Sequence, residues 1–168
     1  YEESLRVPMV VFDPRVKGKA RGQVRNESVL NLDLPSTFLN WAGIKIPERY
    51  QGKTFEKLVS DSKVVPWRDY TFHEHFAVRH RIPAFEGLRG ERYKYVRYVD
   101  EGDYEFLHDL QSDPDELINL AGNLKHRKTL EKMRQLTDQR VEQLGGPLAP
   151  MKGELSLSTV PHPESAAQ

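Results

Sequence analysis

The densest group of chemically versatile side chains lies between Tyr70 and Arg81. It contains three histidines and two arginines: His73, His75, Arg79, His80 and Arg81. If residues 70–76 form a β-strand, His73 and His75 point to the same face, and the other three lie in the following loop. Arginine holds sulfate or carboxylate through two parallel hydrogen bonds, and histidine donates to anions and hydroxyls near neutral pH. The stretch therefore predicts recognition of an anionic or sugar-like group, with His73, His75, Arg79 and His80 as the substrate-binding residues.

Plainer interpretations of the same residues stay open. His73 and His75 could be packed strand residues whose ring nitrogens bond the backbone, and Arg81 is expected to be solvated. A zinc site built from the three histidines is allowed by their spacing. The nearest acidic side chain, Glu74, faces the other side of the expected strand, so it does not complete such a site. We therefore predict no metal ligand in this stretch.

A carboxylate cluster elsewhere in the chain is no better suited to metal binding. Asp113, Asp115 and Glu116 suggest calcium at first sight. Calcium takes about 6–8 oxygen ligands, and the glycine-centred loop spacing of a calcium loop is absent. Pro114 directly after Asp113 is typical of a helical turn with Asp113 as its cap. We therefore assign no metal ligand to these carboxylates.

Composition narrows the classes of function. The chain has 25 lysines and arginines against 25 aspartates and glutamates. Its net charge of zero gives no overall electrostatic attraction to nucleic acid or to an anionic membrane. No stretch approaches the ~20 apolar residues of a membrane span. The absence of cysteine excludes disulfides and thiolate metal sites but leaves the compartment open. Residues 1–8 read like the middle of a protein, so we expect the N-terminal part, with any targeting signal, to be missing.

The elements that must position the histidines are short strands. Alternating patterns rich in aromatic and β-branched residues predict four of them, over residues 70–76, 84–89, 93–99 and 104–110. Their close spacing favours a small antiparallel sheet. Apolar residues at helical spacing predict a helix over 128–144, which Gly145 and Gly146 end. We expect residues 148–168 to form an extended tail.

The first 65 residues read differently. Val7–Phe12 is a continuous apolar run typical of a strand buried on both faces, which needs parallel neighbours that this chain does not supply. We therefore expect it to belong to a sheet whose other strands lie upstream. A helix is predicted over 31–42, with Asp33 as its N-cap and an apolar face. That face consists of Leu34, Phe38, Leu39, Trp41 and Ala42.

Several of these strings resemble the C-terminal part of sulfatases. Residues 1–8 followed by an apolar strand are similar to the segment after that family's active-site lysine. The other matching strings, in the family's order, are Asn31–Thr37 with Ala42–Ile44, Gln51–Phe55, Arg92–Val96, and Phe106–Leu110 with Asp113–Glu116 and Asn119–Ala121. Together they extend over residues 1 to about 124. His108 departs from the pattern, since the family usually has tyrosine there, and we interpret the change as one of packing.

The resemblance implies an α/β fold (α+β as a fragment). Residues 1–65 are expected to be the end of a large alkaline-phosphatase-like sheet, and 66–147 a small antiparallel C-terminal sheet packed by a helix. It also implies a sulfuric ester hydrolase acting on a sulfated carbohydrate through a formylglycine nucleophile and a calcium ion. Both are expected outside this chain, which has no cysteine and no [C/S]-x-P-x-R string. The chain alone is therefore predicted to be inactive, and the expected partners are the missing N-terminal catalytic part and a sulfated small molecule or glycan.

Two other functions stay open from sequence. A phosphoester or phosphonate hydrolase of the same superfamily would share these strings. A non-catalytic binding or structural module of the same fold is disfavoured by the orphan strand at residues 7–12. The resemblance implies a periplasmic, secreted or lysosomal compartment.

Overall fold

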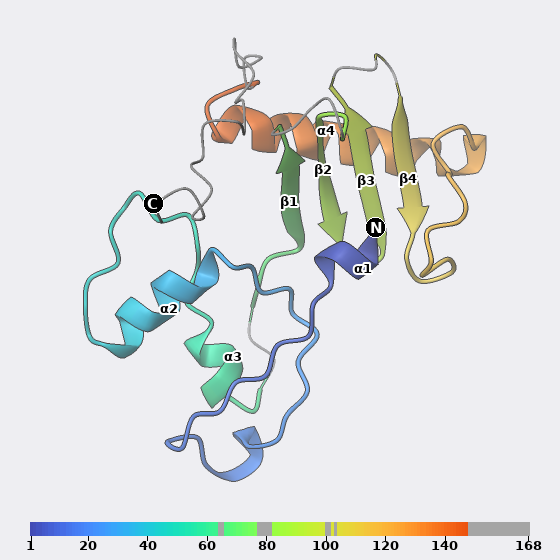
Figure 1. Cartoon of the computed structure of the whole chain (residues 1–168). Helices are drawn as coiled ribbons and strands as arrows, with labels where there is room; N and C mark the ends of the chain where they lie inside the picture. The colour runs from blue at the N-terminus through green and yellow to red at the C-terminus, as the bar shows by residue number, and fades with distance from the viewer. Residues whose placement is uncertain (64–65, 77–81, 100–101, 103, 148–168) are drawn as a thin grey trace, which may run out of the picture.

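A four-stranded antiparallel sheet forms the second half of the molecule in the computed structural model, which describes residues 1–63, 66–76, 82–99, 102 and 104–147 (Figure 1). Its strands are β1 (Tyr70–His75), β2 (Phe85–Gly90), β3 (Tyr93–Tyr98) and β4 (Glu105–Asp109). They pair in sequence order, β1-β2-β3-β4. The sequence prediction of a small antiparallel sheet is confirmed. The predicted site residues Arg79 and His80, and the predicted tail over 148–168, lie outside the described residues.

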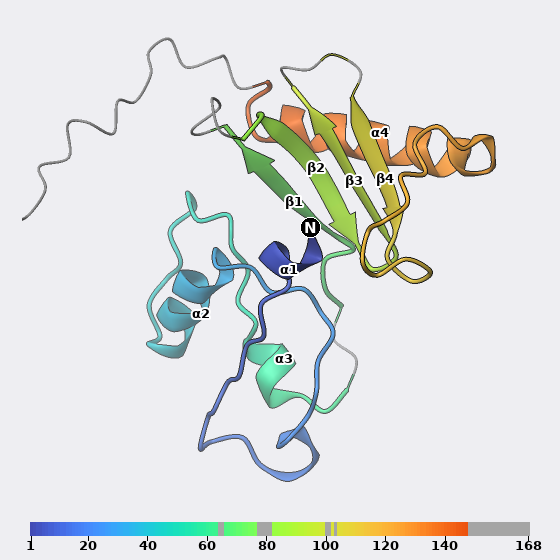
Figure 2. The same cartoon turned by 45° about the vertical axis from the view of Figure 1, so that its right-hand side comes forward.

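One helix, α4 (Arg127–Gln143), covers one face of this sheet, as the rotated view shows most clearly (Figure 2). A short 3-10 turn, η2 (Leu124–His126), leads into it. The helix predicted over 128–144 is thus confirmed within a residue at each end. The core between helix and sheet consists of Leu88, Tyr95, Leu107, Leu130 and Met133. Burying these apolar side chains is the main force that holds the helix on the sheet.

Polar contacts at the rim of this core fix the angle of the helix. The Arg97 guanidinium on β3 bonds Glu86 on β2 at 2.6 Å and Asp138 on α4 at 2.5 Å. The Tyr95 hydroxyl, which is buried, donates to Glu105 at 2.8 Å, and burial with this bond raises the pKa of Tyr95. Arg134 on α4 also pairs with Glu105. Ion pairs and a hydrogen bond thus join α4 and the sheet at the edge of their shared core.

The first half of the chain forms a lobe of short helices below the sheet (Figure 1). Its elements are α1 (Glu2–Leu5), η1 (Gly18–Ala20), α2 (Asp33–Trp41) and α3 (Glu56–Ser60). The helix predicted over 31–42 exists, but its expected faces are wrong. Its buried residues are Asp33, Ser36 and Thr37, while Phe38 is 57% exposed.

The buried face of α2 is polar because each of its side chains meets backbone groups or a counter-ion. The Ser36 hydroxyl donates to the Gly52 carbonyl, and the Thr37 hydroxyl accepts from the Phe55 amide. Asp33 was predicted to be the N-cap, but the N-cap is Leu32 and makes no side-chain bond. The Asp33 carboxylate instead joins three separate segments of the chain.

Four hydrogen bonds converge on Asp33, which is fully buried. It accepts from the backbone amides of Leu30 at 2.7 Å and Lys53 at 2.8 Å. Arg68, at the entrance to β1, donates to both carboxylate oxygens at 2.7 Å. Burial acts to raise the pKa of Asp33, but these bonds outweigh it and hold that pKa below its usual range. Asp33 thus links the lobe to the strand that carries the histidines.

The apolar run Val7–Phe12 is not a strand in this structure, and because the sheet expected to receive it would lie upstream of this chain, the predicted strand stays a prediction. Val7, Val10 and Phe12 are 76%, 93% and 79% exposed. A strand needs a neighbour to pair its backbone, and the described strands pair only among themselves in β1 to β4. The run therefore crosses the surface as an extended apolar segment.

The turn after β4 also differs from the predicted helical turn. Residues 113–116 form a tight turn, closed by the Glu116 amide and the Asp113 carbonyl at 3.2 Å. The Asp113 carboxylate does act as a cap, since it accepts from the amides of Leu117 and Ile118. Glu116 adopts φ +55°, in the left-handed region that side-chain-bearing residues rarely occupy.

Candidate functional site

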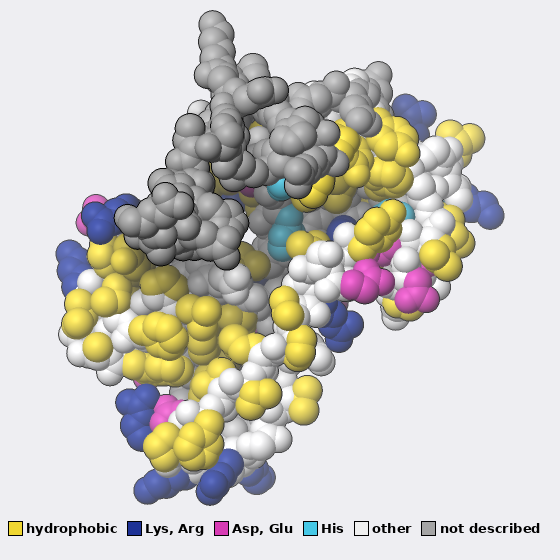
Figure 3. All heavy atoms as spheres, viewed as in Figure 1, with side chains coloured by type: hydrophobic (Ala, Val, Ile, Leu, Met, Phe, Trp, Pro, Cys, Tyr) yellow, Lys and Arg dark blue, Asp and Glu magenta, His cyan; other side chains and the backbone are white. Residues whose placement is uncertain are grey.

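The face of the sheet opposite α4 carries the two histidines that the sequence singled out. Alternation along β1 places Thr71, His73 and His75 on this face, because Tyr70 and Phe72 pack into the core under α4. We call it the open face. Figure 3 views the molecule from this side and shows histidine side chains at the surface near its middle, between the lobe and the sheet. The prediction that His73 and His75 share a face is confirmed.

His73 is held within the fold. Its Nε2 lies 2.8 Å from the Thr71 hydroxyl, and its partner across the ladder is Gly87. Burial lowers the pKa of His73, and the nearby charges of Lys94 and Arg89 lower it further despite the opposing charge of Glu2. A neutral, hydrogen-bonded imidazole in this position orients its surroundings rather than carrying charge. For His73 the structure thus favours the packing interpretation that the sequence left open.

His75, two residues further along β1, is in a different situation. Its ring stacks on Phe85, with centroids 5.7 Å apart and an interplanar angle of 19°. Its Nε2 has no hydrogen-bond partner among the residues that the structure describes. This nitrogen is buried, so its unmet hydrogen bond is a reason to expect a partner from outside the described residues. Of the two histidines, His75 is the better candidate for substrate contact.

Beside His73 lies a cluster of two cations and two carboxylates: Arg89, Lys94, Glu2 and Glu116. We call it the Glu2 cluster. Lys94 Nζ is 2.7 Å from Glu116 Oε1 and 3.6 Å from Glu2 Oε1, with the geometry of ion contacts rather than directed hydrogen bonds. Arg89 donates to Glu2 Oε2 at 3.0 Å. Burial acts to raise the pKa of Glu2, but Arg89 and Lys94 outweigh it and lower that pKa.

Sequence reasoning missed this cluster. Lys94 alternates with Tyr93 and Tyr95, which pack in the core under α4. The same period-2 alternation places Lys94 on the opposite face, opposite Arg89 in the β2–β3 register. Two adjacent cations that are mostly buried require carboxylate partners. The pairing of Arg89 with Lys94 on the open face was therefore the signal that the sequence offered for this cluster. Which carboxylates become the partners depends on the tertiary fold.

Aromatic rings continue the open face beyond His75. Phe85, Tyr98, Tyr104 and Phe106 form successive edge and tilted contacts with centroids 5.0–6.4 Å apart. His108 stacks on Phe106 and lies 3.0 Å from the Ile118 carbonyl through Nδ1. Its burial confirms the interpretation of His108 as a packing residue.

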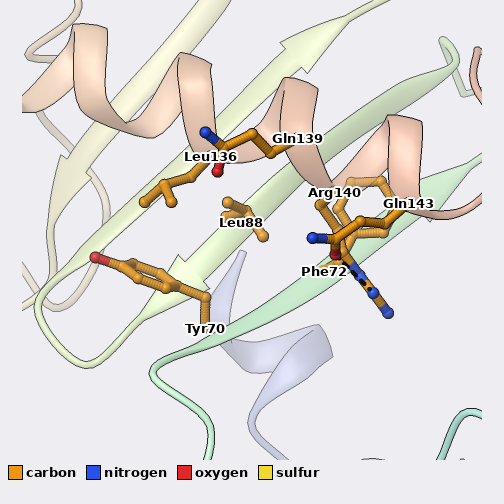
Figure 4. Close-up of a pocket in the computed structure, with 7 residues that line it drawn as sticks. All are labelled: Tyr70, Phe72, Leu88, Leu136, Gln139, Arg140 and Gln143. Atoms are coloured by element: carbon orange, nitrogen blue, oxygen red, sulfur yellow. Dashed lines mark hydrogen bonds between the residues drawn. The ribbon is translucent and has the colours of Figure 1, made fainter.

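Two cavities among the described residues lie away from these histidines. One of about 170 Å³ lies on the α4 side, where Gln139, Arg140 and Gln143 reach over β1 and β2 (Figure 4). Another of about 270 Å³ lies in the lobe, beside Arg15 and Trp41. Neither cavity is lined by His73 or His75.

The described residues offer neither a metal-binding cluster nor a membrane-spanning helix. They contain no group of three or more histidines and carboxylates placed to hold a metal ion. None of their helices is long and apolar enough to cross a membrane. Arg79 and His80, the remaining predicted substrate contacts, follow β1 directly but lie outside the described residues.

Comparisons with known proteins agree on one family. The family model "N-sulphoglucosamine sulphohydrolase, C-terminal" matches residues 1–143. An N-acetylglucosamine-6-O-sulfatase of Bacteroides thetaiotaomicron is 24% identical over 147 residues, which are 85% of this chain and 26% of that protein. A delta 4,5-hexuronate-2-O-sulfatase of the same species is 30% identical over 142 residues, 84% of this chain and 29% of that protein.

Solved structures show the same fold. A 2-O GAG sulfatase superposes with a TM-score of 0.60 at 31% identity, over 66% of this chain and 24% of that one. A phosphonate monoester hydrolase of Agrobacterium radiobacter superposes with a TM-score of 0.53 at 24% identity, over 66% of this chain and 24% of that one. The chain spans between a quarter and a third of the curated relatives named above. The fold is that of one end of a much longer protein of alkaline-phosphatase-like architecture.

Proposed function

Since the chain belongs to the N-sulphoglucosamine sulphohydrolase C-terminal family, we propose that it is the C-terminal part of a sulfuric ester hydrolase that acts on a sulfated carbohydrate. The match over residues 1–143 carries this proposal. Two relatives named as sulfatases of N-acetylglucosamine and of hexuronate support the sugar as substrate. The phosphonate hydrolase likeness supports only the fold.

The contribution of this chain is one wall of the substrate site. His75 has a stacked ring whose buried Nε2 has no partner among the described residues, and His73 is hydrogen-bonded to Thr71 beside it. Arg79 and His80 follow on the same chain segment, where a guanidinium suits a sulfate or carboxylate group. The wall orients the sugar while the ester is cleaved elsewhere.

The nucleophile and the metal come from the rest of the protein in this proposal. The described residues offer no group of three carboxylates or imidazoles for calcium, so we assign no metal ligand and derive no step through the metal here. The segment Val7–Phe12 is the docking contact with that catalytic part. Its side chains are exposed although they are as apolar as a core strand, and exposed patches of this kind mark interaction surfaces. We place the whole enzyme in a periplasmic, secreted or lysosomal compartment.

The test uses the longer protein that contains this chain. It is assayed on N-acetylglucosamine 6-O-sulfate, a 2-O-sulfated unsaturated hexuronate disaccharide, 4-nitrophenyl sulfate and a 4-nitrophenyl phosphonate ester. Hydrolysis of a sulfated sugar with the highest kcat/KM supports the proposal. A preference for the phosphonate ester refutes it and favours the other hydrolase class. This chain expressed alone is expected to hydrolyse none of the four.

Variants of the wall test its role. Loss of one hydrogen bond to substrate lowers kcat/KM by roughly tenfold, so His75→Ala should raise KM for the sulfated sugar by about that factor. His126→Ala is the matched control, because His126 contacts Tyr93 on the α4 side of the sheet. Arg79→Ala and His80→Ala are also expected to raise KM. If KM is unchanged in all three wall variants and they fold normally, these residues do not form part of the substrate site.

A further inference from the structure

The Glu2 cluster joins the start of this chain to the middle of the sheet. Glu2 lies in α1, Arg89 in β2 and Lys94 in β3, and Glu116 lies in the turn after β4. Both cartoon views place α1 against one end of β2 and β3, on the face away from α4 (Figures 1 and 2). The Glu2 amide also donates to Glu116 Oε2 at 2.5 Å. Main chain and side chain of the same residue are thus both fixed.

The turn at Glu116 has the conformation that places its carboxylate beside the Glu2 amide. Glu116 is the one residue other than glycine with positive φ in the described ranges. Such a conformation persists only where the surroundings hold it, and here Lys94 and the Glu2 amide hold the carboxylate. The side chain of Glu116 is 3% exposed and that of Lys94 5% exposed. The backbone of Glu116 thus keeps an unfavourable conformation, and this conformation places the Glu116 carboxylate against α1.

Two functional surfaces meet at this cluster. α1 runs directly into the segment Val7–Phe12, which is the docking contact in the proposed function. Arg89 and Lys94 lie on the open face, and their charges act on His73. The contacts of Glu2 therefore determine how the docking segment is oriented relative to the histidine wall.

We propose that Glu2 is a positioning residue, which through Arg89 and Lys94 fixes the histidine wall relative to the catalytic part that docks on residues 7–12. This inference rests on the proposed function. Glu2 touches no substrate in it. Its role is to keep the wall at the distance where it contacts the sugar while the sulfate ester reaches the nucleophile.

Glu2→Ala in the longer protein tests this role, with Glu3→Ala as the matched control. Glu3 is in the same helical turn but is exposed and has no resolved ion pair. Glu2→Ala leaves the Lys94–Glu116 pair inside the sheet intact, so the fold is retained. We expect kcat/KM for the best sulfated sugar of the panel to fall at least tenfold, and kcat/KM for 4-nitrophenyl sulfate to change less than twofold. The small aryl ester does not reach the wall, whereas a general loss of folding lowers both values together.

Hydrogen exchange supplies a second readout that needs no activity. The Arg6 amide bonds the Glu2 carbonyl within α1, and it should exchange at least tenfold faster in Glu2→Ala and within twofold of wild type in Glu3→Ala. Equal losses on both substrates, or unchanged exchange at Arg6, overturn the positioning role. If the wild-type protein cleaves no sulfate ester, the proposed function fails, and the exchange experiment alone decides whether Glu2 anchors α1. Glu2→Gln, which keeps the shape and removes the charge, should fall between wild type and Glu2→Ala in both experiments.

Discussion

Replacing Asp33 with alanine should release the lobe from the sheet. The carboxylate accepts four hydrogen bonds, two from backbone amides and two from Arg68. It is fully buried, and the Arg68 side chain is only 12% exposed. Removing Asp33 therefore leaves a mostly buried guanidinium and two partly buried amides without their acceptor.

The expected magnitude follows from that geometry. Breaking a buried ion pair by removing one partner costs about 3–5 kcal/mol, because the remaining charge stays buried without compensation. A tenfold change in an equilibrium corresponds to about 1.4 kcal/mol. Opening of the lobe should then become roughly 140- to 3,700-fold more frequent.

Native-state hydrogen exchange of the longer protein measures this opening. The Phe55 amide is a suitable reporter, because it bonds the Thr37 hydroxyl and not Asp33 itself. Its exchange rate should rise by the factor given above in Asp33→Ala. Arg68→Ala should act in the same direction, and the double variant should be more stable than the sum of the two single effects predicts, by about 2 kcal/mol.

Asp138→Ala is the control for loss of a carboxylate from an ion pair. Asp138 pairs with Arg97, but its side chain is 59% exposed. Exposed pairs contribute at most about 1 kcal/mol, so exchange at Phe55 should rise no more than about fivefold. The reasoning is refuted if Asp33→Ala has as small an effect as Asp138→Ala.

Three further changes test other contacts. Gly52→Ala would place a Cβ atom 1.8 Å from a backbone carbonyl oxygen in the loop before α2, and the resulting overpacking should destabilise the protein by about 1–3 kcal/mol or more, seen as a lower Tm. Tyr95→Phe removes the bond to Glu105 but leaves that carboxylate paired, so urea unfolding should report a loss of only about 1 kcal/mol. Arg92, through its hydrogen bonds, lowers the pKa of Asp109 from 3.8 to about 2. The ionised form of Asp109 therefore stabilises the fold fully above pH 3.8, and this stability is lost as pH falls through about 2. Arg92→Ala should make the decline of Tm between these values shallower.

The sheet and α4 were predictable from the sequence because their patterns are local. Alternation along residues 70–76 gave both the strand and the shared face of His73 and His75, and no distant contact was needed. The helix over 127–143 follows from apolar residues at helical spacing in the same way. Here the local pattern and the tertiary contacts agree.

The lobe was less predictable because its buried positions are polar. Hydrophobic periodicity placed Phe38 inside α2 and treated Asp33 as a cap. The structure buries Asp33, Ser36 and Thr37 instead, since partners 16 to 35 residues away satisfy them. The apolar run Val7–Phe12 is exposed in this chain because apolarity leads to burial only where a surface is present to cover it. The Glu2 cluster depends on contacts over 87 and 114 residues, which no local pattern encodes.

The strand order of the sheet has a consequence for the order in which the molecule assembles. Each described strand pairs with its neighbour in sequence, so these pairings close short loops and form early. The contact of Glu2 with Glu116 closes a loop of 114 residues. During synthesis from the N-terminus, residues 1–12 are made well before the turn that receives them. The anchor of α1 thus becomes available only after all four strands of the sheet have been synthesised.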